Sequence, residues 1–81
     1  MKLPRDLSGM DLARALGQFG YEITRQTGSH IRLSRTPGTG HHLTIPAHHT
    51  LKIGTLSAIL TEVAANLETT KAELVKRLFD D

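Results

Sequence analysis

The apolar residues of this chain change their spacing twice along the sequence, and this change limits the folds that the chain can adopt. Between Tyr21 and Ile45 they alternate with polar residues, which is the period of a strand with one buried face. Before and after this stretch they recur every three or four residues, which is the period of an amphipathic helix. The sequence therefore predicts helices on both sides of a group of strands.

The first helix is predicted over about residues 9–19. Ser8 precedes it as an N-cap residue, with Asp11 three positions later in the arrangement of a capping box. Gly20 follows it and favours the left-handed conformation with which helices commonly end. The apolar side of this helix is expected to carry Leu12, Ala15, Leu16 and Phe19.

Three strands are predicted from the alternating stretch, at about residues 21–26, 30–35 and 41–46. Thr27-Gly28-Ser29 separates the first two strands, and residues 36–40, which include a proline and two glycines, separate the second and third. Glycine supplies the positive φ of tight turns and proline fixes φ, so both connections are typical of turns between antiparallel strands.

The alternation also predicts how these strands pair. We expect Gln26 to oppose His30 across a three-residue loop, because the apolar residues of the two strands then share one face. In the second hairpin Ser34 is expected opposite His42. The apolar face then carries Tyr21, Ile23, Ile31, Leu33, Leu43 and Ile45. The polar face carries Glu22, Thr24, Gln26, His30, Arg32, Ser34, His42 and Thr44.

Two more helices are predicted after the strands. Apolar residues at helical spacing indicate one over about 53–65, and a capping box of Thr70 and Glu73 begins a shorter one over about 70–79. The order α-β-β-β-α-α predicts an α+β two-layer fold, with helices on one face of a three-stranded antiparallel sheet. We expect a single domain over residues 1–81, with its core at about 8–67.

Composition narrows the classes of function. No cysteine occurs, so the chain offers neither a disulfide nor a thiolate that could attack a substrate or bind zinc. No apolar run approaches the roughly 20 residues needed to span a bilayer, and the first residues lack the apolar run of a signal peptide. We therefore expect a cytoplasmic protein with no membrane partner.

Charge and aromatic content point to the kind of ligand. The net charge is only +2, but the segment from Arg25 to Lys52 holds four basic residues, all five histidines and no acidic residue, so an anionic partner is expected there. The three aromatic residues, Phe19, Tyr21 and Phe79, are not predicted on the polar face of the sheet. Stacking of single-stranded bases is therefore not expected, and RNA would be contacted through phosphate and 2′-OH groups, as in double-stranded-RNA binding domains.

His30 is the first candidate for chemistry. It begins the middle strand, on the polar face and beside Arg32. An imidazole can take a proton from a ribose 2′-OH near neutral pH, and a neighbouring guanidinium can stabilise the charge that develops on the phosphorus. The alternative interpretation is that His30 is an ordinary solvated residue of a strand.

The remaining histidines lie in two adjacent pairs, His41-His42 and His48-His49. Histidine is a common metal ligand, but neighbours on a strand point to opposite faces, so each pair offers at most one ligand to a site. No cysteine or nearby carboxylate completes a ligand set. We expect neither a functional metal nor another cofactor.

A second candidate site lies where the helix over 53–65 begins. No Ser, Thr, Asp or Asn immediately precedes this helix, so its free N–H groups could bind a phosphate together with Lys52 and Thr55. The alternative is that Gly54 serves only close packing of the helix on the sheet.

Three motifs in this order resemble the HicA family of mRNA interferase toxins. They are Gly28-Ser29-His30, then Pro46-Ala47-His48, and then Gly54-Thr55-Leu56 with Ile59-Leu60. The resemblance covers about residues 8–79, which is nearly the whole chain.

The resemblance implies a fold like that of a double-stranded-RNA binding domain and cleavage of mRNA by a single essential histidine, which corresponds to His30. It also implies a HicB-type antitoxin as protein partner. His48 corresponds to the histidine of the second motif, either as an auxiliary residue or as one that orders the loop.

The sequence therefore predicts a metal-independent endoribonuclease toxin. His30 would be the catalytic base, and Arg32, Lys52, Gly54 and Thr55 would bind phosphate. Ser29, His42 and His48 are possible auxiliary residues, the two histidines being candidates for the acid that protonates the leaving oxygen. The alternatives are a non-catalytic double-stranded-RNA binding module and a small domain that binds only the antitoxin.

Overall fold

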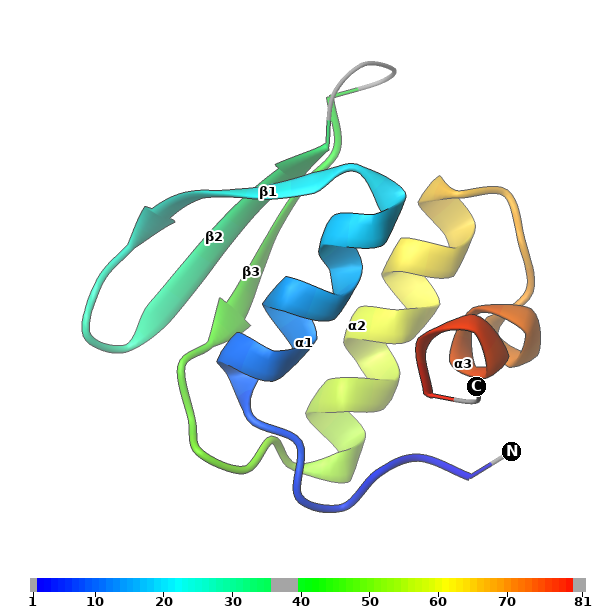
Figure 1. The fold of residues 1–81 in the computed structure, drawn as a ribbon, viewed down its shortest axis with the longest axis horizontal. Helices are drawn as coiled ribbons and strands as arrows, with labels where there is room; N and C mark the ends of the chain where they lie inside the picture. The colour runs from blue at the N-terminus through cyan, green and yellow to red at the C-terminus, as the bar shows by residue number, and fades with distance from the viewer. Residues whose placement is uncertain (1, 36–39, 80–81) are drawn as a thin grey trace. The chain divides into compact units, whose positions relative to one another are not determined.

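The computed structural model describes residues 2–35 and 40–79 (Figure 1). Its elements confirm the predicted α+β fold and the predicted order along the chain. They are helix α1 (Gly9–Leu16), the 3₁₀ helix η1 (Gly17–Phe19), strands β1 (Tyr21–Gln26), β2 (His30–Arg35) and β3 (His42–Pro46), and helices α2 (Ile53–Asn66) and α3 (Lys71–Phe79). Most of the predicted second turn, residues 36–39, lies outside the described residues.

These elements fall into two compact units. One unit, Asp6–Leu51, holds α1 and the three strands, and the other combines Met1–Arg5 with Lys52–Asp81 and so holds α2 and α3. The single domain expected over residues 1–81 stays a prediction.

Helix α1 begins as its cap residue predicts. The Ser8 hydroxyl accepts a hydrogen bond from the Asp11 N–H at 3.0 Å, which satisfies one of the donors left free at the helix start. The buried side of the helix consists of Gly9, Leu12, Ala13 and Leu16, so Ala13 takes the place predicted for Ala15. Gly20 ends the segment with a φ of 93°, in the left-handed region.

The first residue of α1 fits tightly against the end of β3. A Cβ added to Gly9 would lie 2.0 Å from the carbonyl oxygen of Pro46, a distance that no side chain can occupy. The Gly9 N–H also donates a 2.9 Å hydrogen bond to the carbonyl oxygen of His48. The absence of a side chain at Gly9 therefore lets α1 contact both β3 and the loop that follows it.

The strands form one antiparallel sheet in the order β1-β2-β3, and α1 packs against all three strands (Figure 1). The β2–β3 register is as predicted, with Ser34 opposite His42. The apolar face is buried at Tyr21, Ile31, Leu33, Leu43 and Ile45. The prediction that Ile23 is buried there is wrong: it is 41% exposed, and only the first residue of β1 is buried.

The predicted register of the first hairpin is wrong in its inner half. Gln26 opposes Ile31 rather than His30, and a β-bulge lies between Ile23 and Arg25. Thr27 instead faces His30, since the Thr27 N–H donates to the His30 carbonyl oxygen at 2.9 Å. The connection is therefore a two-residue turn, the commonest length in hairpins, and the bulge restores the outer register.

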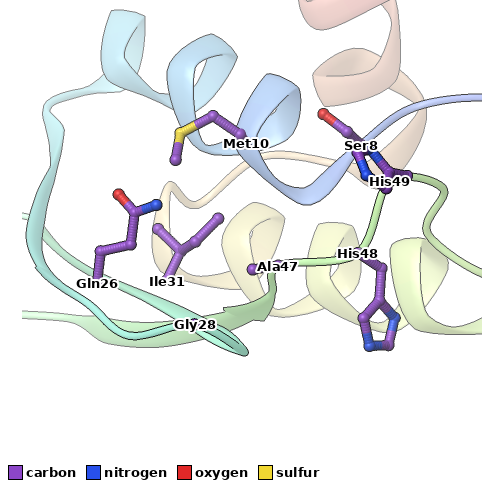
Figure 2. A pocket seen from close by; sticks show the side chains of 8 residues that line it. All are labelled: Ser8, Met10, Gln26, Gly28, Ile31, Ala47, His48 and His49. Carbon is purple, nitrogen blue, oxygen red and sulfur yellow. The ribbon is translucent and has the colours of Figure 1, made fainter.

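This register removes Gln26 from the polar face to which it was assigned. Residues opposite each other share a face, so Gln26 lies on the side of Ile31, and Figure 2 shows both side chains directed toward Met10 of α1. Gly28 in the turn also differs from expectation, because its φ is not positive. Gly40, before β3, does have the expected positive φ, of 70°.

In the second unit, the predicted helices are present. The Thr70 hydroxyl accepts a hydrogen bond from the Glu73 N–H at 3.1 Å, as its capping position predicts, and the Lys71 ammonium of α3 donates to the Ser57 hydroxyl of α2. The apolar side of α2 is buried at Leu56, Leu60, Val63 and Ala64. In the described ranges, no helix has the length and apolar character that crossing a bilayer requires.

Gly9 provides a test of this packing. Gly9→Ala is expected to lower the free energy of unfolding by about 1–3 kcal/mol, because the new methyl group collides with the backbone of Pro46. Gly17→Ala is the matched control: its φ is −57° and its Cβ would meet nothing within 4 Å, so a gain of about 0.4–1 kcal/mol is expected. Urea unfolding measures both. Equal midpoints for Gly9→Ala and wild type would contradict this packing.

Candidate active site

His30 is the first residue of the central strand β2 and its side chain is exposed. It lies opposite Pro46 of β3, and Arg32, two residues later, is exposed on the same face. The intervening Ile31 is fully buried on the other face. The imidazole and the guanidinium thus share the open, polar face of the sheet, as the alternation predicts.

The backbone around His30 is held on both sides. The His30 N–H donates to the Thr27 hydroxyl at 3.1 Å, and the His30 carbonyl accepts from the Thr27 N–H. On the other side, the Ala47 N–H donates to the carbonyl oxygen of Ser29 at 2.9 Å. Residues that follow β1 and β3 therefore hold the backbone from which the imidazole projects.

The ring of His30 is also oriented by a neighbour. Its Nδ1 lies 3.0 Å from the Ser29 hydroxyl oxygen, within hydrogen-bonding distance. When the hydroxyl accepts, Nδ1 carries the proton and Nε2 is the basic nitrogen; when the hydroxyl donates, Nε2 carries the proton. The contact with Ser29 involves only Nδ1, so Nε2 can act as a base or as an acid.

His42 lies farther along the same face. It is directly opposite Ser34, whose hydroxyl oxygen is 2.6 Å from His42 Nδ1. Ser34 is four residues beyond His30 on β2, which at the rise of a strand corresponds to about 13 Å. The two histidines share a face but are well separated.

His41 points the other way and has a structural role. Its Nδ1 lies 2.7 Å from the hydroxyl of the buried Tyr21, and the two rings meet edge to face with centroids 5.7 Å apart. Adjacent histidines therefore divide between two environments, as predicted. Among residues 2–35 and 40–79, no group of three or more potential ligands could hold a metal ion.

His48 follows Ala47 in the loop after β3. Its backbone carbonyl accepts the hydrogen bond from Gly9, which connects this loop to the start of α1. Its ring is exposed and points away from Met10, opposite to Ile31 (Figure 2). Because Ile31 and His30 project from opposite faces of β2, the His48 ring is directed to the side of the sheet that carries His30.

A notch of about 270 Å³ lies on the other side, beside α1 (Figure 2). It is lined by Ser8, Met10, Gln26, Gly28, Ile31, Ala47, His48 and His49. Neither His30 nor Arg32 is part of it. The candidate site is therefore an open sheet face, which suits an extended polymer better than an enclosed small molecule.

The other predicted phosphate ligands belong to the second unit. Lys52 is the N-cap residue of α2 and makes no side-chain cap, and Gly54 and Thr55 lie in the first turn. A methyl group added to Gly54 would meet no described atom within 4 Å, and its φ is not positive. The two interpretations of Gly54, phosphate binding and close packing of the helix on the sheet, both stay predictions.

One basic residue of the polar face was missed by the sequence analysis. The bulge in β1 places Arg25 opposite Arg32, whereas simple alternation assigns Arg25 to the apolar face. The length of the turn could have indicated this placement. With a two-residue turn, Tyr21 and Leu33 can both be buried on one face only if one of the two strands contains an extra residue.

Comparison with known proteins identifies a family. A family model described as the HicA toxin of bacterial toxin-antitoxin matches residues 9–64, more than half of the chain. The matched segment contains α1, the sheet and most of α2, and includes His30 and Arg32. No curated protein and no solved structure shows significant similarity.

The different environments of His41 and His42 can be tested by the free energy of unfolding of two variants. His41→Ala is expected to lower the free energy of unfolding by about 1–2 kcal/mol, because it removes the part-buried contact with the Tyr21 hydroxyl. His42→Ala, on the exposed face, is expected to change it by less than about 0.5 kcal/mol. Equal losses in urea unfolding would argue against a structural role specific to His41.

Proposed function

Because this chain belongs to the HicA toxin family of bacterial toxin–antitoxin systems, we propose that it is an endoribonuclease that cleaves mRNA with His30 as its catalytic histidine. The observation that carries this proposal is the geometry of β2. An exposed imidazole is held by Ser29 and shares an open face with an exposed guanidinium, that of Arg32. Family membership implies an antitoxin partner, and we propose a HicB-type protein in that role.

In the proposed reaction, His30 Nε2 takes the proton of a ribose 2′-OH. The 2′-oxygen attacks the adjacent phosphorus, and the bond from phosphorus to the 5′-oxygen breaks. The products are a 2′,3′-cyclic phosphate and a 5′-hydroxyl, and the leaving oxygen takes its proton from an acid. Arg32 would stabilise the negative charge of the phosphorane.

His48 is the better of the two candidates for the acid. Its loop pairs with the turn that precedes His30, through the hydrogen bond between Ala47 and Ser29, and its ring is directed to the same side of the sheet (Figure 2). His42 is about 13 Å away along the sheet and its Nδ1 is already bonded to Ser34. We therefore assign the acid to His48 and a peripheral role to His42.

The start of α2 would hold another part of the RNA backbone. Lys52 provides a cation, Gly54 leaves space for close approach, and Thr55 adds a hydroxyl beside N–H groups without a side-chain cap. Phosphates bind well to such helix starts.

Replacement of His30 tests the assignment. General acid–base catalysis contributes about 10²–10⁴-fold, so His30→Ala is expected to reduce mRNA cleavage by at least about 100-fold and to abolish growth arrest after induction. The thermal melt should change little because the side chain is exposed. His49→Ala, an exposed histidine outside the proposed chemistry, is the matched control and should cleave like wild type.

A different result would identify the alternative function. If wild type binds double-stranded RNA in a salt-sensitive manner without producing fragments, and His30→Ala binds equally well, the protein is a non-catalytic binding module.

Cleavage should not depend on a metal ion. The proposed mechanism assigns proton transfer to imidazoles and charge stabilisation to Arg32, so an excess of EDTA is expected to leave the initial rate within about twofold of the untreated rate. Loss of activity in EDTA, restored by one divalent metal and not by buffer exchange, would contradict this mechanism.

A further inference from the structure

The β-bulge in β1 creates a pair of arginines that face each other across two strands. Ile23 pairs with Leu33, the next pair is Arg25 with Arg32, and Thr24 between them is the extra residue. The Thr24 hydroxyl donates to the carbonyl oxygen of Arg32 at 3.4 Å. Both arginines are exposed, and both belong to the unit formed by residues 6–51.

The bulge redirects Arg25. In a regular strand Arg25 would lie on the side of Tyr21 and Ile23, facing α1. Because residues directly opposite each other share a face, the observed pairing places it with Arg32 on the polar face. Bulges commonly redirect a side chain in this way beside active sites.

Nothing in the described part of the chain compensates these two charges. Like charges directly opposite each other on a sheet destabilise it. The one acidic residue of β1, Glu22, faces Ser34, and no ion pair joins it to either arginine. From Arg25 to Lys52 the sequence contains no acidic residue at all. Two positive charges therefore occupy paired positions of one face without an acidic partner among the described residues.

We propose that Arg25 and Arg32 together bind the RNA phosphate that is attacked beside His30. This inference rests on the proposed function, because it names the ligand of that same face. Guanidinium groups form paired hydrogen bonds with phosphate oxygens, and two from adjacent strands can hold one phosphate from two sides. Arg32 is two residues, or about 7 Å, from His30 along β2, within the reach of its long side chain.

The first experiment requires no RNA cleavage. Inorganic phosphate should raise the melting temperature of wild type, because it relieves the repulsion between the two arginines. Arg25→Gln and Arg32→Gln should each abolish most of this increase. Arg14→Gln removes an exposed arginine from α1, on the other side of the sheet, and should preserve it.

The second experiment measures RNA binding in the His30→Ala background, with a short mixed-sequence RNA at several salt concentrations. Adding Arg25→Gln is expected to weaken binding about tenfold and to reduce the slope of log affinity against log salt by about 1. Arg14→Gln should leave the slope unchanged. The double variant Arg25→Gln/Arg32→Gln should lose less than the sum of the two single losses, because both residues bind one phosphate.

The outcomes separate this inference from the proposed function. If Arg25→Gln behaves like Arg14→Gln in both experiments, the shared phosphate site is overturned, whether or not wild type cleaves RNA. If the losses are additive, the two arginines bind separate phosphates and the shared site is also overturned. If both experiments give the expected results but wild type produces no fragments, the phosphate site stands and the proposed nuclease activity fails.

Discussion

The burial of Ile31 and Leu33 in the central strand determines which way the candidate catalytic residues point. Both side chains are fully buried, and burying each one stabilises the fold by about 1.5–3 kcal/mol. Since a strand alternates its faces, His30 and Arg32 must project from the opposite side. A slip of one residue would expose both apolar side chains and bury a histidine and an arginine, so hydrophobic packing and the proposed chemistry depend on the same register.

The sheet is tied to α1 by contacts at the end where His30 lies. Gly9 contacts the Pro46 backbone and donates to the carbonyl of His48, while Ala47 donates to Ser29, the residue before His30. The loop that carries His48 is thus held between the helix start and the turn that positions His30. This explains how residues from two different motifs of the sequence reach one end of the sheet.

The sequence was sufficient for the order of the elements and for the register between β2 and β3, because the alternation is strong in these strands and capping residues precede α1 and α3. It was insufficient for the first hairpin, where the alternation of apolar residues and the preference for a two-residue turn predict different registers. Alternation alone required a three-residue loop between β1 and β2, whereas the chain forms the shorter turn and accommodates it with a bulge. As a result of this turn and bulge, Gln26 lies on the apolar face and Arg25 lies on the polar face. The exposure of Ile23 could not be predicted either, since periodicity does not show how far a covering helix extends over an edge strand.

For the candidate site, periodicity predicted the placement of His30 and Arg32 but not what each histidine does. His41 and His42 are adjacent in sequence, and only the structure shows that one bonds to Tyr21 and the other to Ser34.

Whether His30 transfers a proton is tested by the rate constant of RNA cleavage at saturating RNA, compared between wild type and His30→Ala. We expect a fall of at least about 100-fold with an unchanged affinity for RNA, because the imidazole transfers a proton and does not hold the backbone. An unchanged rate constant would show that the exposed imidazole on β2 takes no part in the reaction.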